Sequence, residues 1–308
     1  MRDPLAPFVA ARGAAVLDGG LATELEARGL DLRDPLWSAR ALLEAPELVE
    51  AIHRDYLEAG ADVITTATYQ ATLPGLAARG LTADAARGVL VSGVAIALRA
   101  RDAFSRGKER ARPRPLVAAS IGSYGAFLAD GSEYRGAYGL DADALCGWHR
   151  PRVRILEGSG ADLLAFETIP SLIEVEAIVE LLGEAEGPPA WVSLQTRDGA
   201  RLADGSGIAP AAALLAASPR AFACGVNCVP PESVAEVLET LSGLTSKPLV
   251  AYPNRGDAWD AVRRRWIPRP GVADLGPHVS AWRAAGARLI GGCCRTTPDD
   301  IRAIAAAL

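Results

Sequence analysis

The fold class is decided by residues 163–196, LLAFETIPSLIEVEAIVELLGEAEGPPAWVSLQT. The apolar run 163–169 is short and ends at a proline, as expected of a fully buried strand. Residues 171–186 place Leu, Ile and Val at helical spacing among glutamates, and 190–196 is a second short apolar run. A strand, a helix and a strand in direct succession indicate two parallel strands joined by a crossover helix.

The same alternation of strand and helix is found eight times along the chain. We expect strands at 14–20, 62–69, 116–122, 163–169, 190–196, 221–228, 248–254 and 288–294. We expect the helices that follow them at 47–59, 84–102, 141–158, 171–186, 209–217, 231–242, 274–285 and 298–307. Eight uninterrupted units predict an α/β protein with a closed (β/α)8 TIM barrel, and Asp18-Gly19-Gly20-Leu21 lacks the spacing of a dinucleotide-binding turn. No linker divides residues 1–308, so we expect a single domain with insertions at 125–140 and 255–273.

Composition excludes several classes of protein. The 308 residues carry a net charge of −5, which disfavours nucleic acid as a partner. The basic run 263–265, followed by Trp266, is isolated and is interpreted as a solvated loop or lid. No apolar stretch is long enough for a membrane helix, and residues 1–7 do not resemble a secretion signal. Five cysteines, an odd number, favour a reduced and cytoplasmic protein.

Active sites of such barrels lie at the carboxyl ends of the strands, so the polar residues there are candidates. These residues are Asp18, Thr68, Tyr69, Gln70, Ser120, Glu167, Gln195, Asn227, Cys228, Asn254, Cys293 and Cys294. Three thiolates, from Cys228, Cys293 and Cys294, would suit Zn²⁺ with one position left open. Adjacent strand residues point to opposite faces, so the Cys293–Cys294 pair meets one metal only if the chain has already left the strand. Inert buried thiols or a disulfide between the adjacent pair are the alternatives.

The remaining cysteines and the histidines are interpreted as structural. Cys146 lies in a predicted helix, and Cys224 is expected on the same inward face as Cys228 but deeper in the core. All three histidines, His53, His149 and His278, fall in helical segments away from the rim. We therefore expect no histidine ligand.

Five segments resemble the homocysteine S-methyltransferase family, in order, from about residue 13 to the end of the chain. They are LDGG at 17–20, FETIP at 166–170, GVNC at 225–228, YPN at 252–254 and GGCCRTTP at 291–298. The resemblance implies a (β/α)8 barrel and one zinc ion on Cys228, Cys293 and Cys294. The segment TATYQAT at 66–72 is similar to the branch that uses S-methylmethionine or S-adenosylmethionine, rather than betaine. The expected reaction moves a methyl group from such a sulfonium donor to the thiolate of homocysteine, giving methionine.

Two carboxylates are candidates for binding the ammonium group of homocysteine. Asp18 lies two residues after Val16, and Glu167 lies two residues after Ala165, so each pair points to the same side of its strand. We expect that side to face the interior of the barrel, where two carboxylates could bind one ammonium group. The resemblance to the family supports the same role.

Further residues are candidates for other roles in substrate binding. The backbone amides near Gly19 and Gly20 are candidates for the substrate carboxylate, and Asn227 either binds substrate or braces the loop that carries Cys228. The aromatic faces of Trp37 and Tyr69 are candidates for attracting the sulfonium cation.

Several alternatives remain open. The same fold accommodates betaine as donor or selenohomocysteine as acceptor, and a non-catalytic barrel would hold a structural zinc. An aldolase-type lyase would need a lysine at a strand end, and Lys108 and Lys247 occupy no such position. A cobalamin-dependent module would need a further domain. The sequence leaves the oligomeric state open.

Overall fold

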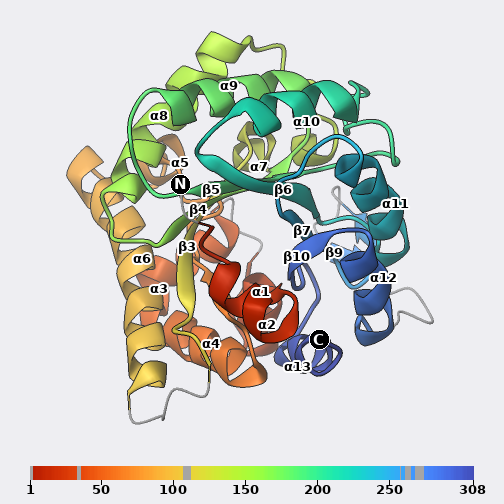
Figure 1. Ribbon diagram of the computed structural model, residues 1–308. Helices are drawn as coiled ribbons and strands as arrows, with labels where there is room; N and C mark the ends of the chain where they lie inside the picture. The colour runs from red at the N-terminus through yellow and green to blue at the C-terminus, as the bar shows by residue number, and fades with distance from the viewer. Residues whose placement is uncertain (1–2, 33–35, 107–111, 257, 261–264, 268–273) are drawn as a thin grey trace.

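The computed structural model describes residues 3–32, 36–106, 112–256, 258–260, 265–267 and 274–308 (Figure 1). Its main sheet has eight strands, all parallel to their neighbours. They are β1 (Ala15–Val16), β2 (Val63–Thr65), β3 (Leu116–Gly122), β4 (Leu163–Ile169), β5 (Ala190–Leu194), β6 (Ala221–Asn227), β7 (Leu249–Tyr252) and β10 (Ala287–Ile290).

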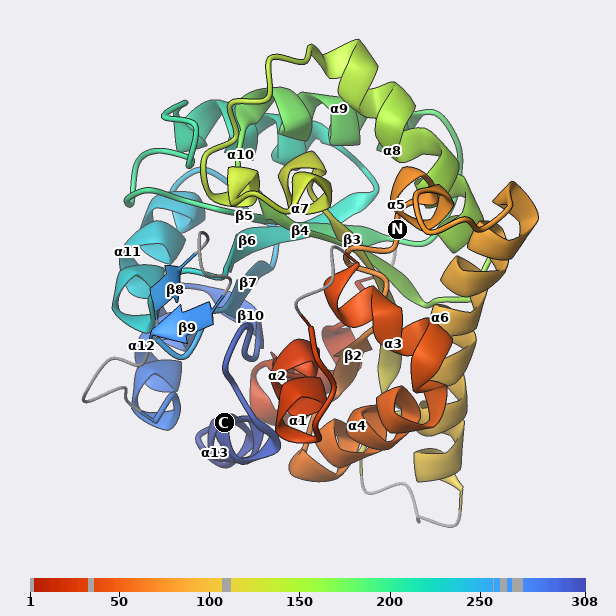
Figure 2. The same cartoon turned by 180° about the vertical axis from the view of Figure 1, so that it is seen from behind.

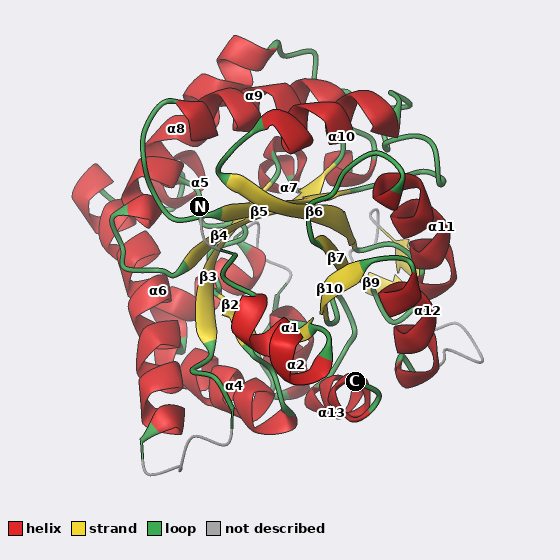
Figure 3. Ribbon diagram, viewed as in Figure 1, coloured by secondary structure: helices red, strands yellow, loops and turns green. Residues whose placement is uncertain are grey.

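The sheet closes on itself. Its strands run in the order β1-β10-β7-β6-β5-β4-β3-β2, so β1 and β2 are the two ends. These ends meet through a parallel bridge between Leu17 and Val63, with the amide of Asp18 donating to the carbonyl of Val63 at 3.0 Å. The amide of Asp62 donates to the carbonyl of Val16 at 2.7 Å. This confirms the predicted barrel (Figure 3).

Helices form a ring around the barrel, as Figure 1 shows. They are α4 (Pro46–Ala59), α6 (Ala83–Ser105), α8 (Ala142–Glu157), α9 (Leu172–Gly183), α10 (Ile208–Ala217), α11 (Pro231–Ser242), α12 (Val279–Ala284) and α13 (Pro298–Ala306). Their bounds differ by only a few residues from those that the sequence predicts, except that α12 begins later, after the 3₁₀ turn η3 (Gly276–His278). No helix within the described ranges is long and apolar enough to cross a bilayer.

Several short elements lie at the two ends of the barrel, and the alternation of strands and helices in the sequence does not predict them. They are α1 (Ala6–Arg12), α2 (Leu21–Ala27), η1 (Trp37–Arg40), α3 (Ala41–Glu44), α5 (Leu73–Ala77), α7 (Tyr124–Leu128), η2 (Ser132–Tyr134), and the antiparallel pair β8 (Ala258–Asp260) and β9 (Arg265–Ile267). Helix α1 closes the amino-terminal end, since Leu5 and Phe8 pack into the same cluster as the interior residues Trp191 and Leu289. The remaining short elements gather mostly at the opposite end, in front of the strands in Figure 2.

The buried residues form two layers, and they correct two expectations. The interior layer contains Ala15 and Leu17 of the first unit, whereas Val16 packs in the outer layer against the helices. Val16 therefore does not point into the barrel, although we expected it to share an inward face with Asp18. That expectation was wrong because Asp18 lies beyond the end of β1, where the alternation of side chains no longer holds. Cys224 also packs in the outer layer, so it does not share an inward face with Cys228.

Candidate active site

One pocket at the carboxyl ends of the strands is lined by most of the candidate residues. Asp18, Gly19, Gly20, Tyr69, Glu167, Asn227, Cys228, Cys293 and Cys294 all line it. Trp37 begins η1, but its side chain lies outside the described part of the structure. The helices that carry His53, His149 and His278 contribute no histidine to this lining.

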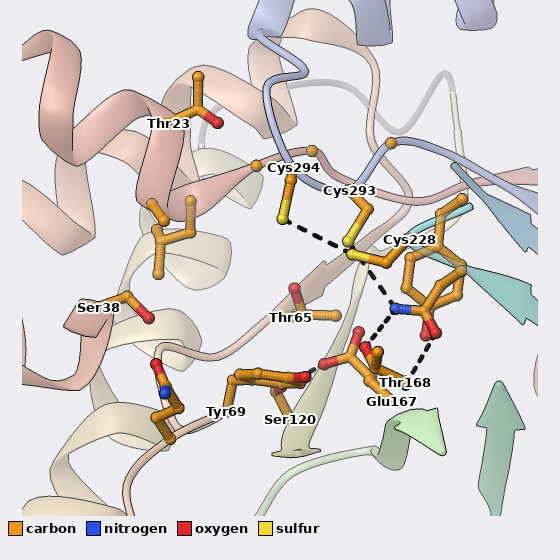
Figure 4. Close-up of a pocket in the computed structure, with 18 of the residues that line it drawn as sticks. Thr23, Ser38, Thr65, Tyr69, Ser120, Glu167, Thr168, Cys228, Cys293 and Cys294 are labelled. Carbon is orange, nitrogen blue, oxygen red and sulfur yellow. Dashed lines mark hydrogen bonds between the residues drawn. The ribbon is translucent and has the colours of Figure 1, made fainter. Parts of the chain in front are cut away.

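The three cysteine thiols converge on one point of the pocket (Figure 4). Their Sγ atoms lie within 4.8 Å of one another, and those of Cys228 and Cys294 are 3.6 Å apart. Cys228 directly follows β6 and has a φ of 53°, while Cys293 and Cys294 lie beyond the end of β10 at Ile290. Because both chain segments have left their strands, the alternation of side chains no longer separates the adjacent pair.

A glycine allows this turn. A Cβ added at Gly291 would lie 2.6 Å from both the Cβ and the carbonyl oxygen of Leu17, so no other residue fits between β10 and β1. Beyond it, the amide of Gly292 donates to the carbonyl of Asp18 at 3.0 Å, and that of Cys293 donates to the carbonyl of Pro253 at 2.7 Å. The cysteine pair is thus anchored to two other units of the barrel.

The sulfur cluster has the dimensions of a tetrahedral metal site. With zinc–sulfur bonds of about 2.3 Å, two sulfurs of a tetrahedron lie about 3.8 Å apart, close to the 3.6 Å between Cys228 and Cys294. Hydrogen bonds from the thiols of Cys293 and Cys294 lower the pKa of Cys228 well below its usual value. Within the described residues no fourth cysteine, histidine or carboxylate joins this group. Three ligands and an open position are typical of a catalytic rather than a structural zinc site.

Asp18 is held rigidly at the edge of the pocket. Its side chain is buried and accepts hydrogen bonds from the amide of Thr65 at 2.8 Å and from the hydroxyl of Thr65 at 3.1 Å. Burial raises the pKa of Asp18 well above its usual value despite these bonds. A ligand cation beside Asp18 would offset the cost of burying its charge.

Glu167 lies near the end of β4 and its carboxylate is also buried. It accepts a hydrogen bond from the hydroxyl of Ser120 (Figure 4). Burial raises the pKa of Glu167 to about 8, and the nearby Cys293 adds to the rise. No described residue that lines the pocket is Lys, Arg or His, whereas Asp18, Glu26, Glu133 and Glu167 are acidic. The pocket therefore attracts cationic ligands.

Asn227 holds together the two segments that carry Glu167 and the cysteines. Its Oδ1 atom accepts hydrogen bonds from the amide of Thr168 and the hydroxyl of Ser193, both at 2.8 Å. Its Nδ2 atom donates to the hydroxyl of Thr168 at 2.8 Å and to the sulfur of Cys293 at 3.8 Å. Thr168 has a φ of 59°, which is strained for a β-branched residue. These contacts match the bracing role among the two roles expected for Asn227.

The amide of Gly20 has a different role from the one expected. The amide of Gly20 donates to the hydroxyl of Thr296 at 3.0 Å and to its carbonyl at 3.2 Å. It is therefore already engaged within the protein rather than available to a substrate carboxylate. Since Thr296 is far away in the sequence, local reasoning did not reveal this pairing.

Tyr69 follows β2 and its ring lies along the floor of the pocket (Figure 4). A hydrogen bond with Thr168 ties it to the turn after Glu167. Its carbonyl accepts a bond of 3.3 Å from the buried Arg152, which also donates to the carbonyl of Gly122 at 2.6 Å. Arg152 thus fixes the backbone beneath the ring.

Sequence reasoning missed several residues of the pocket. Thr65, Thr168, Glu133 and Tyr134 line it, and Thr296 buttresses it. Ser120 also lines the pocket, and it was among the candidates because it is the polar end of an apolar strand. The others lie in loops or mid-pattern positions that no local periodicity distinguishes.

Comparison with known proteins agrees with this geometry. Residues 15–308 match the sequence profile of homocysteine S-methyltransferase. The chain is 47% identical over 305 residues to homocysteine S-methyltransferase of Escherichia coli strain K12, covering 99% of this chain and 98% of that one. It is 46% identical to selenocysteine Se-methyltransferase of Brassica oleracea var. italica, covering 95% and 88%. The crystal structure of the homocysteine methyltransferase MmuM from Escherichia coli in its metallated form superposes with a TM-score of 0.90 at 45% identity, covering 99% and 100%. The chain belongs to the homocysteine S-methyltransferase family.

Proposed function

We propose that this homocysteine S-methyltransferase holds zinc on Cys228, Cys293 and Cys294 and takes its methyl group from a sulfonium donor, S-methylmethionine or S-adenosylmethionine. The product from homocysteine is methionine. The observation that carries the proposal is the pocket itself, in which three converging thiols are surrounded by carboxylates and, within the described lining, by no basic side chain. The proposal treats residues 1–308 as one substrate-binding domain.

The donor set supports zinc as the metal. Sulfur ligands favour zinc over hard cations such as magnesium, and the spacing of Cys228 and Cys294 fits a tetrahedral ion. The metallated form of the Escherichia coli relative is consistent with a metal in this family. When bound, zinc would lower the pKa of the homocysteine thiol, so that the acceptor reacts as a thiolate.

Asp18 and Glu167 are the proposed binding site for the ammonium group of homocysteine. Both carboxylates are buried at the rim, and burial raises the pKa of each. An ammonium ion between them supplies the missing positive charge and fixes the orientation of the thiol. Thr65 and Ser120 hold the two carboxylates in position.

The transfer needs no proton donor for its leaving group. The acceptor sulfur uses one lone pair to form the new bond to the methyl carbon. The bond from that carbon to the donor sulfur breaks, and its electron pair returns to the donor as a neutral thioether. This agrees with a described lining that holds no histidine or lysine. The ring of Tyr69, and Trp37 as the second candidate, are proposed to attract the sulfonium cation.

The charge of the pocket favours one class of donor. S-methylmethionine and S-adenosylmethionine carry a net positive charge at neutral pH, whereas betaine is neutral overall. Four carboxylates line the described pocket, so they attract the first class more strongly.

A selenol acceptor is the second candidate function. It is favoured by the similarity to a Brassica enzyme named for selenocysteine methylation. A selenol is more acidic than a thiol and would use the same cysteine cluster and the same ammonium site.

We also infer a cytoplasmic location, since the five cysteines are free thiols and three of them form the site.

The test is methionine formation from isotopically labelled homocysteine, with S-methylmethionine as donor. We expect labelled methionine, and we expect a strong zinc chelator to abolish it. Parallel reactions replace the donor by S-adenosylmethionine or betaine, and the acceptor by selenohomocysteine. Turnover with betaine alone would overturn the sulfonium proposal, and full activity in metal-free protein would overturn the role of zinc.

A further inference from the structure

One carboxylate of the pocket has a buried oxygen atom that makes no hydrogen bond with a described residue. Glu133 lies on η2, within the insertion between β3 and α8. Its Oε2 atom is buried and has no hydrogen-bond partner among the described residues. The nearest basic residue in sequence, Arg135, is paired with Asp130 at 3.7 Å. Burial raises the pKa of Glu133 to about 7.

The position of Glu133 is fixed by close backbone packing. A Cβ added at Gly125 would lie 2.4 Å from the amide nitrogen of Glu133, so α7 and η2 are in direct contact. The amide of Tyr134 donates to the carbonyl of Gly131 at 3.1 Å, which closes the turn of η2. Glu133 is therefore held at the pocket wall, where an unpaired buried charge is costly unless a ligand supplies its partner.

Glu133 lies at a different part of the pocket from the sulfur cluster. Its charge acts on the hydroxyls of Tyr69 and Tyr134, and the charge of Cys228 acts on the same two hydroxyls. The carboxylate that acts most strongly on the Cys228 thiol is Glu167. The two tyrosines therefore lie within electrostatic reach of both Glu133 and Cys228, while Glu133 itself is not part of the sulfur cluster.

This placement determines which cation Glu133 suits. The donor sulfur must approach the acceptor sulfur, so it lies beside the cysteines. A sulfonium also loses its charge during transfer, so a carboxylate bound directly to it would stabilise the substrate more than the transition state. The cation left for Glu133 is the α-ammonium group, which S-methylmethionine and S-adenosylmethionine both carry several bonds away from the sulfur.

We propose that Glu133 binds the α-ammonium group of the methyl donor and thereby selects sulfonium donors that are amino acids. This rests on the proposed function, because it assumes a sulfonium donor. Asp18 and Glu167 then serve the ammonium group of the acceptor, and Glu133 serves that of the donor. The pocket holds one carboxylate site for each amino-acid substrate.

The experiment compares two sulfonium donors in the E133Q variant of the full chain. The first donor is S-methylmethionine, and the second is dimethylsulfoniopropionate, which has a sulfonium and a carboxylate but no ammonium group. Loss of a charged hydrogen bond predicts a KM for S-methylmethionine that rises about tenfold or more. We expect kcat, the zinc content and the KM for homocysteine to stay unchanged. The affinity for dimethylsulfoniopropionate should also be unchanged. It is measured as a KM if the compound is a substrate, or otherwise as its inhibition constant against S-methylmethionine.

Matched variants complete the test. E133D keeps the charge and should recover part of the affinity, while D130N removes a nearby exposed carboxylate that pairs with Arg135 and should behave as wild type. An unchanged KM in E133Q would overturn the proposal. So would an equal loss for both donors, because it would mean that Glu133 only shapes the pocket. If zinc-containing wild type accepts no sulfonium donor, the proposed function itself fails, and that result is distinct from either of these.

Discussion

Cys228 and Cys294 are held from different strand ends, and their sulfurs are 3.6 Å apart. This separation leaves room for an ion between them without movement of the backbone. Cys228 is buried and has a positive φ, so the surrounding structure maintains a conformation that an isolated chain would avoid. The surrounding structure therefore holds Cys228 in the conformation that brings its sulfur close to that of Cys294.

Replacing Cys294 with Ala should remove zinc and activity together. Two thiolates do not complete the three-ligand set that a catalytic zinc needs. The matched control is Cys146→Ala, since Cys146 is a buried cysteine on α8, far from the sulfur cluster in sequence and absent from the pocket. Zinc content by mass spectrometry and methionine formation are measured on both. Stoichiometric zinc in Cys294→Ala would contradict the ligand assignment.

Glu167→Gln should weaken homocysteine binding while zinc stays bound. The amide keeps the shape and a hydrogen bond from Ser120 but loses the charge that we propose pairs with the ammonium group of homocysteine. We expect the KM for homocysteine to rise about tenfold to a hundredfold. The exposed Glu176→Gln on the following helix is the control. Unchanged affinity in Glu167→Gln would remove its proposed role.

At the level of elements, α1 closes the barrel at the end away from the pocket. Phe8 is 2% exposed and packs among interior residues such as Trp191 and Leu289. The sequence did not reveal this element because it precedes the first strand and is too short for a clear period. A barrel interior is a packed core, so the plug stabilises the fold without touching substrate.

Phe8→Ala should therefore separate stability from catalysis. Truncation of a buried phenylalanine lowers the free energy of unfolding by about 3–5 kcal/mol. Denaturant titration measures this, and steady-state kinetics on the folded variant should show unchanged KM values for both substrates. A change in KM at full zinc content would mean that α1 influences the opposite end of the barrel.

A buried ionic network links α8 and α9 to the pocket. His149 lies 2.9 Å from Glu174, and Arg152 lies 3.1 Å from the other ring nitrogen of His149. Arg152 then donates to the carbonyls of Gly122 and Tyr69. The helices expected only to cover the barrel thus also fix the loop beneath the Tyr69 ring.

For the whole molecule, His53 sets an acid limit on stability. It is fully buried on α4, and neither ring nitrogen has a hydrogen-bond partner among the described residues. Burial lowers the pKa of His53 from 6.5 to about 4. The unfolded chain therefore binds a proton between these two values, while the folded chain does not. Above pH 6.5, His53 is neutral in both states and has no effect on the pH dependence of stability. As the pH falls from 6.5 toward 4, protonation of the unfolded chain lowers the free energy of unfolding.

His53→Leu should abolish this part of the pH dependence. The difference in unfolding free energy between variant and wild type should grow by up to about 3 kcal/mol as the pH falls from about 6.5 to about 4. Denaturant titrations across that range measure it. Taking the difference cancels the opposite contribution of Asp18 and Glu167, whose raised pKa values favour the folded state at low pH. A constant difference would show that His53 has the same pKa in the folded and the unfolded chain.

The sequence by itself determined the repeated architecture and the position of the sulfur cluster. Strands β3 and β4 begin and end where predicted, and α10 begins one residue earlier than predicted, because apolar periodicity is a local property. The three cysteines were placed together because parallel strands of a barrel end at the same rim.

Only the tertiary structure decided which partners each polar group finds. Asn227 braces Thr168, the amide of Gly20 is engaged by Thr296, and Oε2 of Glu133 has no hydrogen-bond partner among the described residues. These pairings join residues far apart in the chain, and the absence of a partner depends on everything that surrounds a side chain. Local patterns carry no information about either, because contacts between distant segments arise only when the barrel closes.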